Sequence, residues 1–161
     1  MKTTAFLLLI LFTLKEGDFV KWGYIVRDSD GKQVDLPLIL MEKRCVLLNF
    51  YSTGCSECKK EIPFLNEIYK RYKEKGLEVL MVAVGEDEGS AEKIKKKFGI
   101  PFRVIADKHG KVSEEFGIGS FFPQSFFISR NMKVIKKFLG NLEIYKNSVY
   151  NLIEKILEVK K

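Results

Sequence analysis

The residues with the clearest capacity for chemistry are two cysteines separated by two residues, Cys55 and Cys58. This spacing occurs in zinc sites, in covalent haem attachment and in reversible disulfides. A zinc site needs four ligands, and the other candidates are Cys45, in a predicted strand, and the single histidine, His109. Haem attachment needs a histidine directly after the second cysteine, where Lys59 stands. We therefore expect a reversible disulfide, with no metal and no organic cofactor.

The position of the pair favours redox chemistry over packing. The cysteines follow a predicted buried strand, residues 45–51, and open a predicted helix, residues 55–75. Amide groups and the positive dipole end of the first helical turn stabilise a thiolate. Cys55 is then the exposed nucleophile that attacks a partner disulfide, and Cys58, one turn further on, resolves the mixed disulfide. The alternative is that both cysteines only fill space in the core.

Hydrophobic periodicity predicts the elements that position the pair. Residues 24–26 and 32–36 have the pattern of a hairpin around a turn at residues 28–31. The other predicted elements are strand 45–51, helix 55–75, strand 77–84, a helix capped by Ser90 and ending at 98–99, strand 102–106, helix 112–116, strands 125–129 and 134–139, and helix 142–159. This order predicts an α/β fold, a central mixed sheet with helices on both faces and an N-terminal β-hairpin.

Residues 49–63 read NFYSTGCSECKKEIP, and further matching stretches lie at residues 97–102, 106–107, 116–118 and 122–128. These stretches resemble thioredoxin-like thiol–disulfide oxidoreductases of the TlpA/ResA type. The resemblance implies a thioredoxin fold and a protein-disulfide reductase without metal or cofactor. It also implies an exported or membrane-tethered protein, of a kind that often serves cytochrome c maturation.

The resemblance further implies a cis peptide bond before Pro123, opposite the dithiol, where the family positions substrate backbone; the alternative is an ordinary trans loop proline. Three departures from the family pattern lie around this site. Gly54 replaces the usual tryptophan, Ser56 and Glu57 replace the common Glu-Pro pair, and Phe122 is bulkier than the usual Thr or Val. We expect Gly54, Ser56, Glu57 and Phe122 to border the bound substrate.

A proton acceptor for Cys58 is predicted at Glu61. Many thioredoxins carry a buried aspartate six residues before the first cysteine, but this chain has Asn49, which cannot titrate. Glu61 lies three residues after Cys58 and so shares its helix face, and in the resembling family a glutamate at this place is the functional acid. The alternative is a solvated helix carboxylate.

The first residues of the chain indicate in which cellular compartment the protein acts. Residues 5–14 form an apolar run, broken only by Thr13, that is too short to span a bilayer but suits a signal core. We expect residues 1–14 to be a signal peptide or membrane anchor and residues 17–161 to be one thioredoxin-like domain. The alternative is the first strand or helix of a cytoplasmic protein. The net charge of +7 comes with no nucleic-acid motif, and the lysines at residues 93–97 fit a solvated helix face.

Together these features predict a monomeric reductase that acts on disulfides of an extracytoplasmic partner protein, in the periplasm or cell envelope. Its electrons would come from a membrane dithiol donor. The rival functions are a peroxiredoxin-like peroxidase, a non-enzymatic copper-carrier module and a cytoplasmic thioredoxin. No proline precedes Cys55 at the distance a peroxiredoxin needs, and copper carriers of this fold use a Cys-x-x-x-Cys spacing with a distant histidine.

Overall fold

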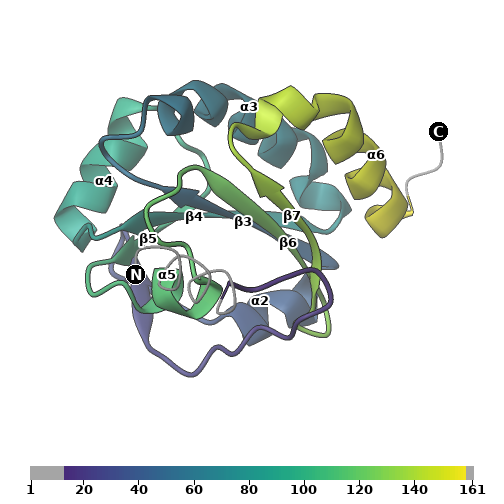
Figure 1. Cartoon of the computed structure of the whole chain (residues 1–161), viewed down its shortest axis with the longest axis horizontal. Coiled ribbons are helices and arrows are strands. Elements are labelled where there is room, and N and C mark those ends of the chain that lie inside the picture. Colours follow the sequence, from purple (N-terminus) through teal and green to yellow (C-terminus); the bar gives the residue numbers. More distant parts are fainter. Residues whose placement is uncertain (1–12, 159–161) are drawn as a thin grey trace, which may run out of the picture.

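The computed structural model describes residues 13–158, and in these residues seven strands form one mixed sheet flanked by helices (Figure 1). The strands are β1 (Val26–Asp28), β2 (Gln33–Val34), β3 (Cys45–Tyr51), β4 (Leu77–Val84), β5 (Arg103–Asp107), β6 (Gln124–Ser129) and β7 (Val134–Leu139). Their order across the sheet is β2-β1-β5-β4-β3-β6-β7. Strands β3, β4 and β5 run parallel, while β1, β2, β6 and β7 pair with antiparallel neighbours. The predicted mixed sheet and N-terminal hairpin are confirmed.

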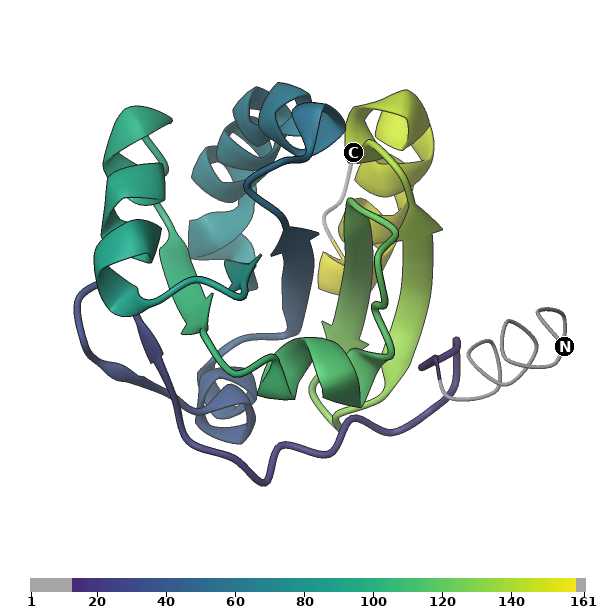
Figure 2. The same cartoon turned by 60° about the vertical axis from the view of Figure 1, so that its left-hand side comes forward.

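Helices cover both faces of the sheet (Figures 1 and 2). They are α2 (Leu36–Glu42), α3 (Ser56–Tyr72), α4 (Glu88–Lys97), α5 (Lys111–Phe116) and α6 (Lys146–Leu157), with 3-10 turns η1 (Lys73–Lys75) and η2 (Leu142–Tyr145). One hydrophobic core lies between the sheet and α3, α4 and α6, and the other between the sheet and α2 and α5. The sheet thus separates two hydrophobic cores.

Strand β3 divides its side chains between these cores by simple alternation. Leu47 and Tyr51 enter the core under α3, whereas Leu48 and Phe50 enter the opposite core. Successive side chains of a strand point to opposite faces, so the odd-numbered residues of β3 share the α3 face. Asn49 is therefore directed toward α3, although it is polar and fully buried.

Three local predictions were wrong. The first strand was expected at residues 24–26, but β1 lies two residues later, and the other two errors concern helix starts. Residue 36 was expected to end a strand, but it begins α2, whose cap Asp35 accepts a hydrogen bond from the Leu38 amide at 3.2 Å. Helix α4 was expected to be capped by Ser90, but Asp87 is the cap and accepts from the Ser90 amide at 2.8 Å. A carboxylate at the cap satisfies an otherwise unpaired amide three residues later, which places Ser90 inside the first turn.

The sheet topology brings the dithiol loop and the Pro123 loop to the same edge. Because β3 and β4 are parallel, the loops that follow them leave from one edge of the sheet. Strand β6 runs against β3 and begins at that edge, where Gln124 pairs with Phe50. The residues just before β6 therefore lie beside the residues just after β3, which lead into Cys55.

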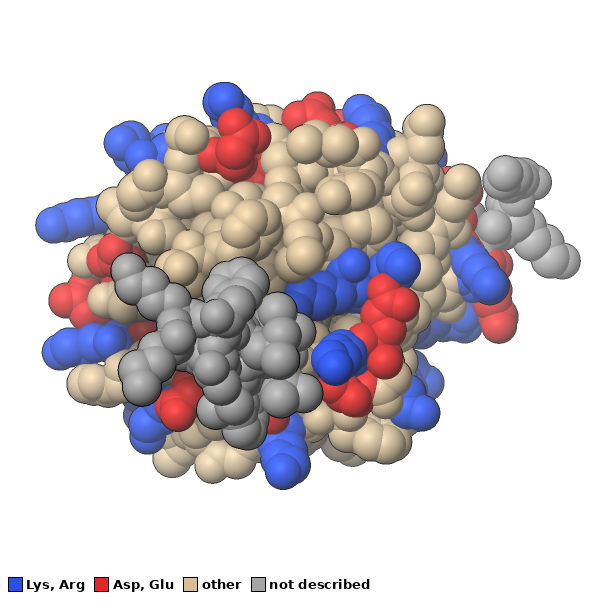
Figure 3. Space-filling model, in the orientation of Figure 1, with Lys and Arg blue, Asp and Glu red and all other residues tan. Residues whose placement is uncertain are grey.

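The N-terminal prediction falls mostly outside the structure. Residues 1–12 of the predicted signal or anchor are not among the described residues. Within residues 13–158 no helix is long and apolar enough to cross a membrane. On the face shown in Figure 3, basic and acidic side chains are interspersed rather than gathered into one basic surface.

Candidate active site

Cys55 and Cys58 form a disulfide at the start of α3, with their Cα atoms 5.3 Å apart. Cys55 occupies the N-cap position, and its Sγ accepts a hydrogen bond from the Cys58 amide at 3.1 Å. Cys55 is partly exposed, while only 1% of Cys58 is accessible, as the sequence predicted. An amide aimed at Sγ and the helix N-terminus both favour the thiolate of Cys55 once the disulfide is reduced.

The peptide bond between Phe122 and Pro123 is cis, as predicted. Pro123 is buried, and its carbonyl accepts a hydrogen bond from the Gly140 amide at 2.9 Å, which ties the start of β6 to the end of β7. Phe122 is half-buried and packs against both cores. The more accessible ring belongs to its neighbour Phe121, which is 56% exposed and was not among the predicted site residues.

The residues of the Cys-x-x-Cys segment that were predicted to border the substrate are at least partly exposed to solvent. Gly54 is exposed, and a Cβ added there would meet nothing within 4 Å. Ser56 is exposed and Glu57 is half-buried. The position that carries a tryptophan in the resembling family is therefore an open part of the rim in this chain, next to the accessible sulfur.

Glu61 is fully buried in α3, one helical turn after Cys58, so the alternative of a solvated helix carboxylate is wrong. Its Oε1 accepts from Asn49 Nδ2 and its Oε2 accepts from the Leu142 amide, each at 2.6 Å. Burial raises the pKa of Glu61 to about 7, against the lowering effect of these two hydrogen bonds, and the negative charge of Glu57 raises it further. The carboxyl group therefore changes protonation near neutral pH.

Asn49 joins this carboxyl group to the sheet. Its Nδ2 also donates to Ser125 Oγ at 3.0 Å, and Ser125 is the direct cross-strand partner of Asn49. The Oδ1 atom of Asn49 is buried and has no hydrogen-bond partner within residues 13–158. Ser125 was not among the predicted site residues, because its contact with Asn49 depends on the register between β3 and β6.

Glu57 has a different environment, although it lies one turn from Glu61 on the same helix. Its Oε1 pairs with Lys60 Nζ at 2.7 Å, and its Oε2 accepts from Asn141 Nδ2 at 3.2 Å. These hydrogen bonds, that from Lys60 first, lower the pKa of Glu57. The pKa values of these two carboxyl groups are thus shifted in opposite directions: Glu57 stays charged, while Glu61 titrates near neutrality.

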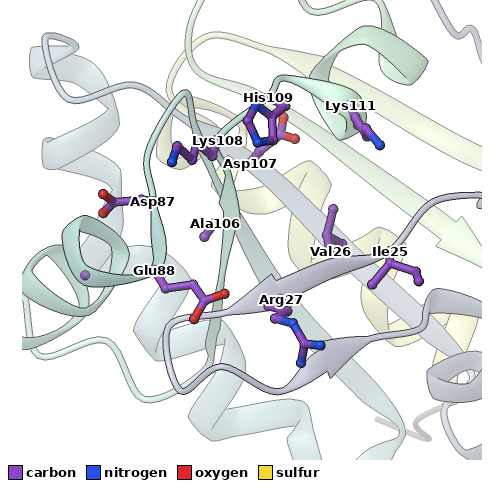
Figure 4. Close-up of a pocket in the computed structure, with 11 residues that line it drawn as sticks. Ile25, Val26, Arg27, Asp87, Glu88, Ala106, Asp107, Lys108, His109 and Lys111 are labelled. Atoms are coloured by element: carbon purple, nitrogen blue, oxygen red, sulfur yellow. The ribbon is translucent and has the colours of Figure 1, made fainter.

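The single histidine lies at a separate cavity. His109 is exposed in the turn after β5, as predicted, and lines a cavity of about 490 Å³ between β1, the start of α4 and that turn (Figure 4). Exposed charges of both signs border it, including Arg27, Lys108 and Glu88. Neither cysteine lines the cavity. Within the described residues no group of three or more His, Cys, Asp or Glu side chains could hold a metal ion.

Comparison with known proteins agrees with this geometry. The sequence profile of the AhpC/TSA family matches residues 11–137. The chain belongs to the AhpC/TSA family. A curated member from Bacillus cereus, the thiol-disulfide oxidoreductase ResA, is 34% identical over 134 residues, which is 83% of this chain and 75% of the relative. The matches cover between 55% and 79% of the curated ResA relatives' own length.

Solved structures place this family member among thioredoxin-like proteins. A crystal structure of a protein assigned as the thiol:disulfide interchange protein DsbE, from Chlorobium tepidum, is 27% identical, with a TM-score of 0.79 over 90% of this chain and 99% of the other. The peroxidoxin BcpB from Mycobacterium tuberculosis superposes with a TM-score of 0.74 over 92% of this chain and 99% of the other. Its identity is 18%, so it shows the shared fold alone. The chain is a thiol–disulfide oxidoreductase with a thioredoxin fold.

The raised pKa of Glu61 predicts how this family member's stability depends on pH. Because the pKa in the folded state, about 7, exceeds the ordinary glutamate value of 4.5, the folded state binds the extra proton. That contribution to stability is complete below pH 4.5 and is lost as pH rises through 7. In the oxidised protein, replacement Glu61→Gln removes this dependence. Asn49 can turn its amide to accept from the new Nε2.

Urea unfolding at several pH values measures the effect. Between pH 4 and pH 8, the unfolding free energy of Glu61→Gln relative to wild type should rise by about 3 kcal/mol, at about 1.36 kcal/mol per pKa unit. Glu92→Gln, which changes an exposed carboxylate of α4 whose pKa is lowered by Lys96, is the control and should show no rise of this sign. A difference between Glu61→Gln and wild type that stays constant with pH would show that the carboxyl group titrates normally.

Proposed function

We propose that this protein reduces disulfides in a partner protein by attack of Cys55 and resolution by Cys58. The observation that carries the proposal is the partly exposed Cys55 at the N-cap of α3, bonded to a buried Cys58. The Cys55 thiolate attacks one partner sulfur and releases the other as a thiolate. Cys58 then attacks Cys55 Sγ, releases the second partner thiolate and leaves the Cys55–Cys58 disulfide. Two electrons pass to the partner, and a membrane dithiol donor restores the dithiol.

In this proposal Glu61 accepts the proton of Cys58. A buried thiol has a raised pKa, so the resolving attack needs a base nearby. Glu61 lies three residues along the same helix face, is itself buried, and has a pKa of about 7, which suits a general base near neutral pH. Asn49, which donates a hydrogen bond to Glu61, has no group that titrates in this pH range. The transfer runs directly or through one bridging water.

Substrate backbone is proposed to lie along the cis Phe122–Pro123 segment, beside Cys55. Gly54, Ser56 and Phe122 would border it, with Glu57 at the far side of the motif. The open space at Gly54 and the accessible ring of Phe121 support contact with a bulky polypeptide. Such a surface suits a protein substrate better than a small thiol, because large apolar contacts add to binding only when the partner covers them.

The two rival functions have less support. A peroxidase would need a proline at a fixed distance before the attacking cysteine, and Cys55 lacks it. A copper carrier would use His109, which lines the separate cavity of Figure 4 together with neither cysteine. Peroxide consumption and copper titration of the reduced protein distinguish these functions from disulfide reduction.

Substitution of single cysteines tests the proposed roles. Cys55→Ser should abolish reduction of insulin disulfides, because no other accessible thiolate replaces it. Cys45→Ala is the matched control: Cys45 is a fully buried thiol at the start of β3, at the end of the strand opposite the dithiol, and burial raises its pKa to about 12, so this variant should retain activity. The turbidity of precipitating insulin B chain reports the rate. Equal loss of activity in both variants would contradict the assignment.

We further propose that the protein acts outside the cytoplasm, in the periplasm or cell envelope, and serves cytochrome c maturation as a monomer. Residues 1–14 would be a signal peptide or membrane anchor and residues 17–161 the catalytic domain. The apolar run at residues 5–14 and the similarity to ResA support this proposal.

Fractionation of cells tests the location. The full chain should remain in membranes after a carbonate wash, because an uncleaved apolar segment holds it there, and a chain that begins at residue 17 should be released. Recovery of the full chain only in the cytosol would contradict both the export and the tether.

A further inference from the structure

The turn between β7 and η2 is bonded to α3 at two neighbouring points. Asn141 Nδ2 donates to Glu57 Oε2 at 3.2 Å, in the first turn of the helix. The next residue, Leu142, donates its backbone N–H to Glu61 Oε2 at 2.6 Å. Asn141 also caps η2, since its Oδ1 accepts from the Glu143 amide at 3.0 Å. The buried side chain of Asn141 thus connects Glu57 to the turn that carries the Leu142 N–H, which is a donor to Glu61.

We propose that Asn141 is a positioning residue for the reductase: its side chain clamps the β7–η2 turn to α3 and so holds the Leu142 N–H against the carboxylate of Glu61. This inference rests on the proposed role of Glu61 as proton acceptor. The side-chain hydrogen bonds of Asn141 go to Glu57 and Glu143, and it acts through Leu142, whose side chain is buried in the core between the sheet and α6.

The chemistry of the amide explains why an asparagine fits this place. The turn needs an acceptor toward the Glu143 amide and a donor toward the Glu57 carboxylate, and one planar amide supplies both. Serine would retain the cap but is too short to reach Glu57. Aspartate would retain the cap but would present a second negative charge to Glu57, which would open the link instead of closing it.

The clamp controls the charge state of Glu61. The groups around Glu61 are Glu57 and the disulfide-bonded Cys58 on its own helix, Asn49 on β3, with Ser125 of β6 behind it, and the Leu142 amide on the turn. Of these, the two hydrogen bonds lower the pKa of Glu61, while burial and the charge of Glu57 raise it. Lys60 pairs with Glu57 on the solvent side. If the turn moves away, burial remains but one of the two stabilising donors is lost.

Carboxyl ¹³C NMR on the full, oxidised chain measures the titration of Glu61 directly. The wild-type midpoint should lie at about 7. In Asn141→Ala and in Asn141→Ser the midpoint should rise by about one pH unit, the shift expected for a lost charge-assisted hydrogen bond. Glu143→Gln is the matched control: it changes an exposed side chain of the same turn and leaves both Asn141 contacts in place, so its midpoint should be that of wild type.

A second readout follows the resolving step. The pH at which mixed-disulfide resolution becomes fast should rise by the same amount in Asn141→Ser, with the rate above that pH unchanged. Asn141→Ser keeps the η2 cap, so it tests the clamp even where Asn141→Ala fails to fold. A wild-type midpoint in Asn141→Ser would overturn the proposal, because the cap alone would then hold the turn.

The experiments distinguish the positioning role of Asn141 from the role of Glu61 as proton acceptor. If Glu61→Gln resolved mixed disulfides as fast as wild type, Glu61 would not be the proton acceptor, yet the midpoint shift in Asn141→Ser would still be observed. If that shift were absent while Glu61→Gln was slow, the reductase mechanism would stand without a role for Asn141.

Discussion

A carboxyl group buried in the helix that carries the disulfide, one turn after Cys58, is the constraint around which this site is built. Burying a charged carboxylate costs several kcal/mol unless donors surround it, and a carboxyl group in that position protonates instead when the donors are too few. Glu61 has two donors, Asn49 and the Leu142 amide, which is enough to hold its pKa at about 7 rather than higher. The number and placement of these donors decide whether the group is a base at neutral pH.

Three distant parts of the chain meet to supply that environment. Strand β3 directs Asn49 toward α3, and its antiparallel register with β6 puts Ser125 opposite. The β7–η2 turn brings the third contribution, 81 residues from Glu61 in the sequence. A thioredoxin-type sheet is therefore more than a support for the dithiol, because its strand pairings determine the protonation of the residue behind the dithiol. The same helix keeps Glu57 charged in solvent, one turn away.

Much of this arrangement could be predicted from the sequence, because local patterns determined it. Strands β3, β4 and β7 have the predicted bounds. Strands β3 and β4 are mostly apolar runs followed by turn residues, and β7 follows the turn at Asn131 and ends before Gly140. The burial order of Cys55 and Cys58 followed from one cysteine at a cap and the other one turn later. The spacing between Cys58 and Glu61 likewise indicated a shared helix face.

Features that depend on tertiary contacts were missed. Asn141 lies in a loop with no motif, and its bond to Glu57 joins residues 84 positions apart. Ser125 is an ordinary strand residue until the register with Asn49 is known. Helix α2 was missed for a different reason. Its aspartate cap, followed by Pro37 in the first turn, is a local sequence signal for a helix start that hydrophobic periodicity does not reveal.

Removal of the Cys58 proton by Glu61 is tested most directly by the resolving step alone. A mixed disulfide preformed between Cys55 and a fluorescent peptide thiol, mixed rapidly into buffers from pH 5 to 9, gives the rate of Cys58 attack. Wild type should show a rise in rate with a midpoint near 7, and Glu61→Gln should lose that rise and be slower by on the order of 10²-fold at neutral pH. Resolution by Glu61→Gln at the wild-type rate across this range would contradict the account.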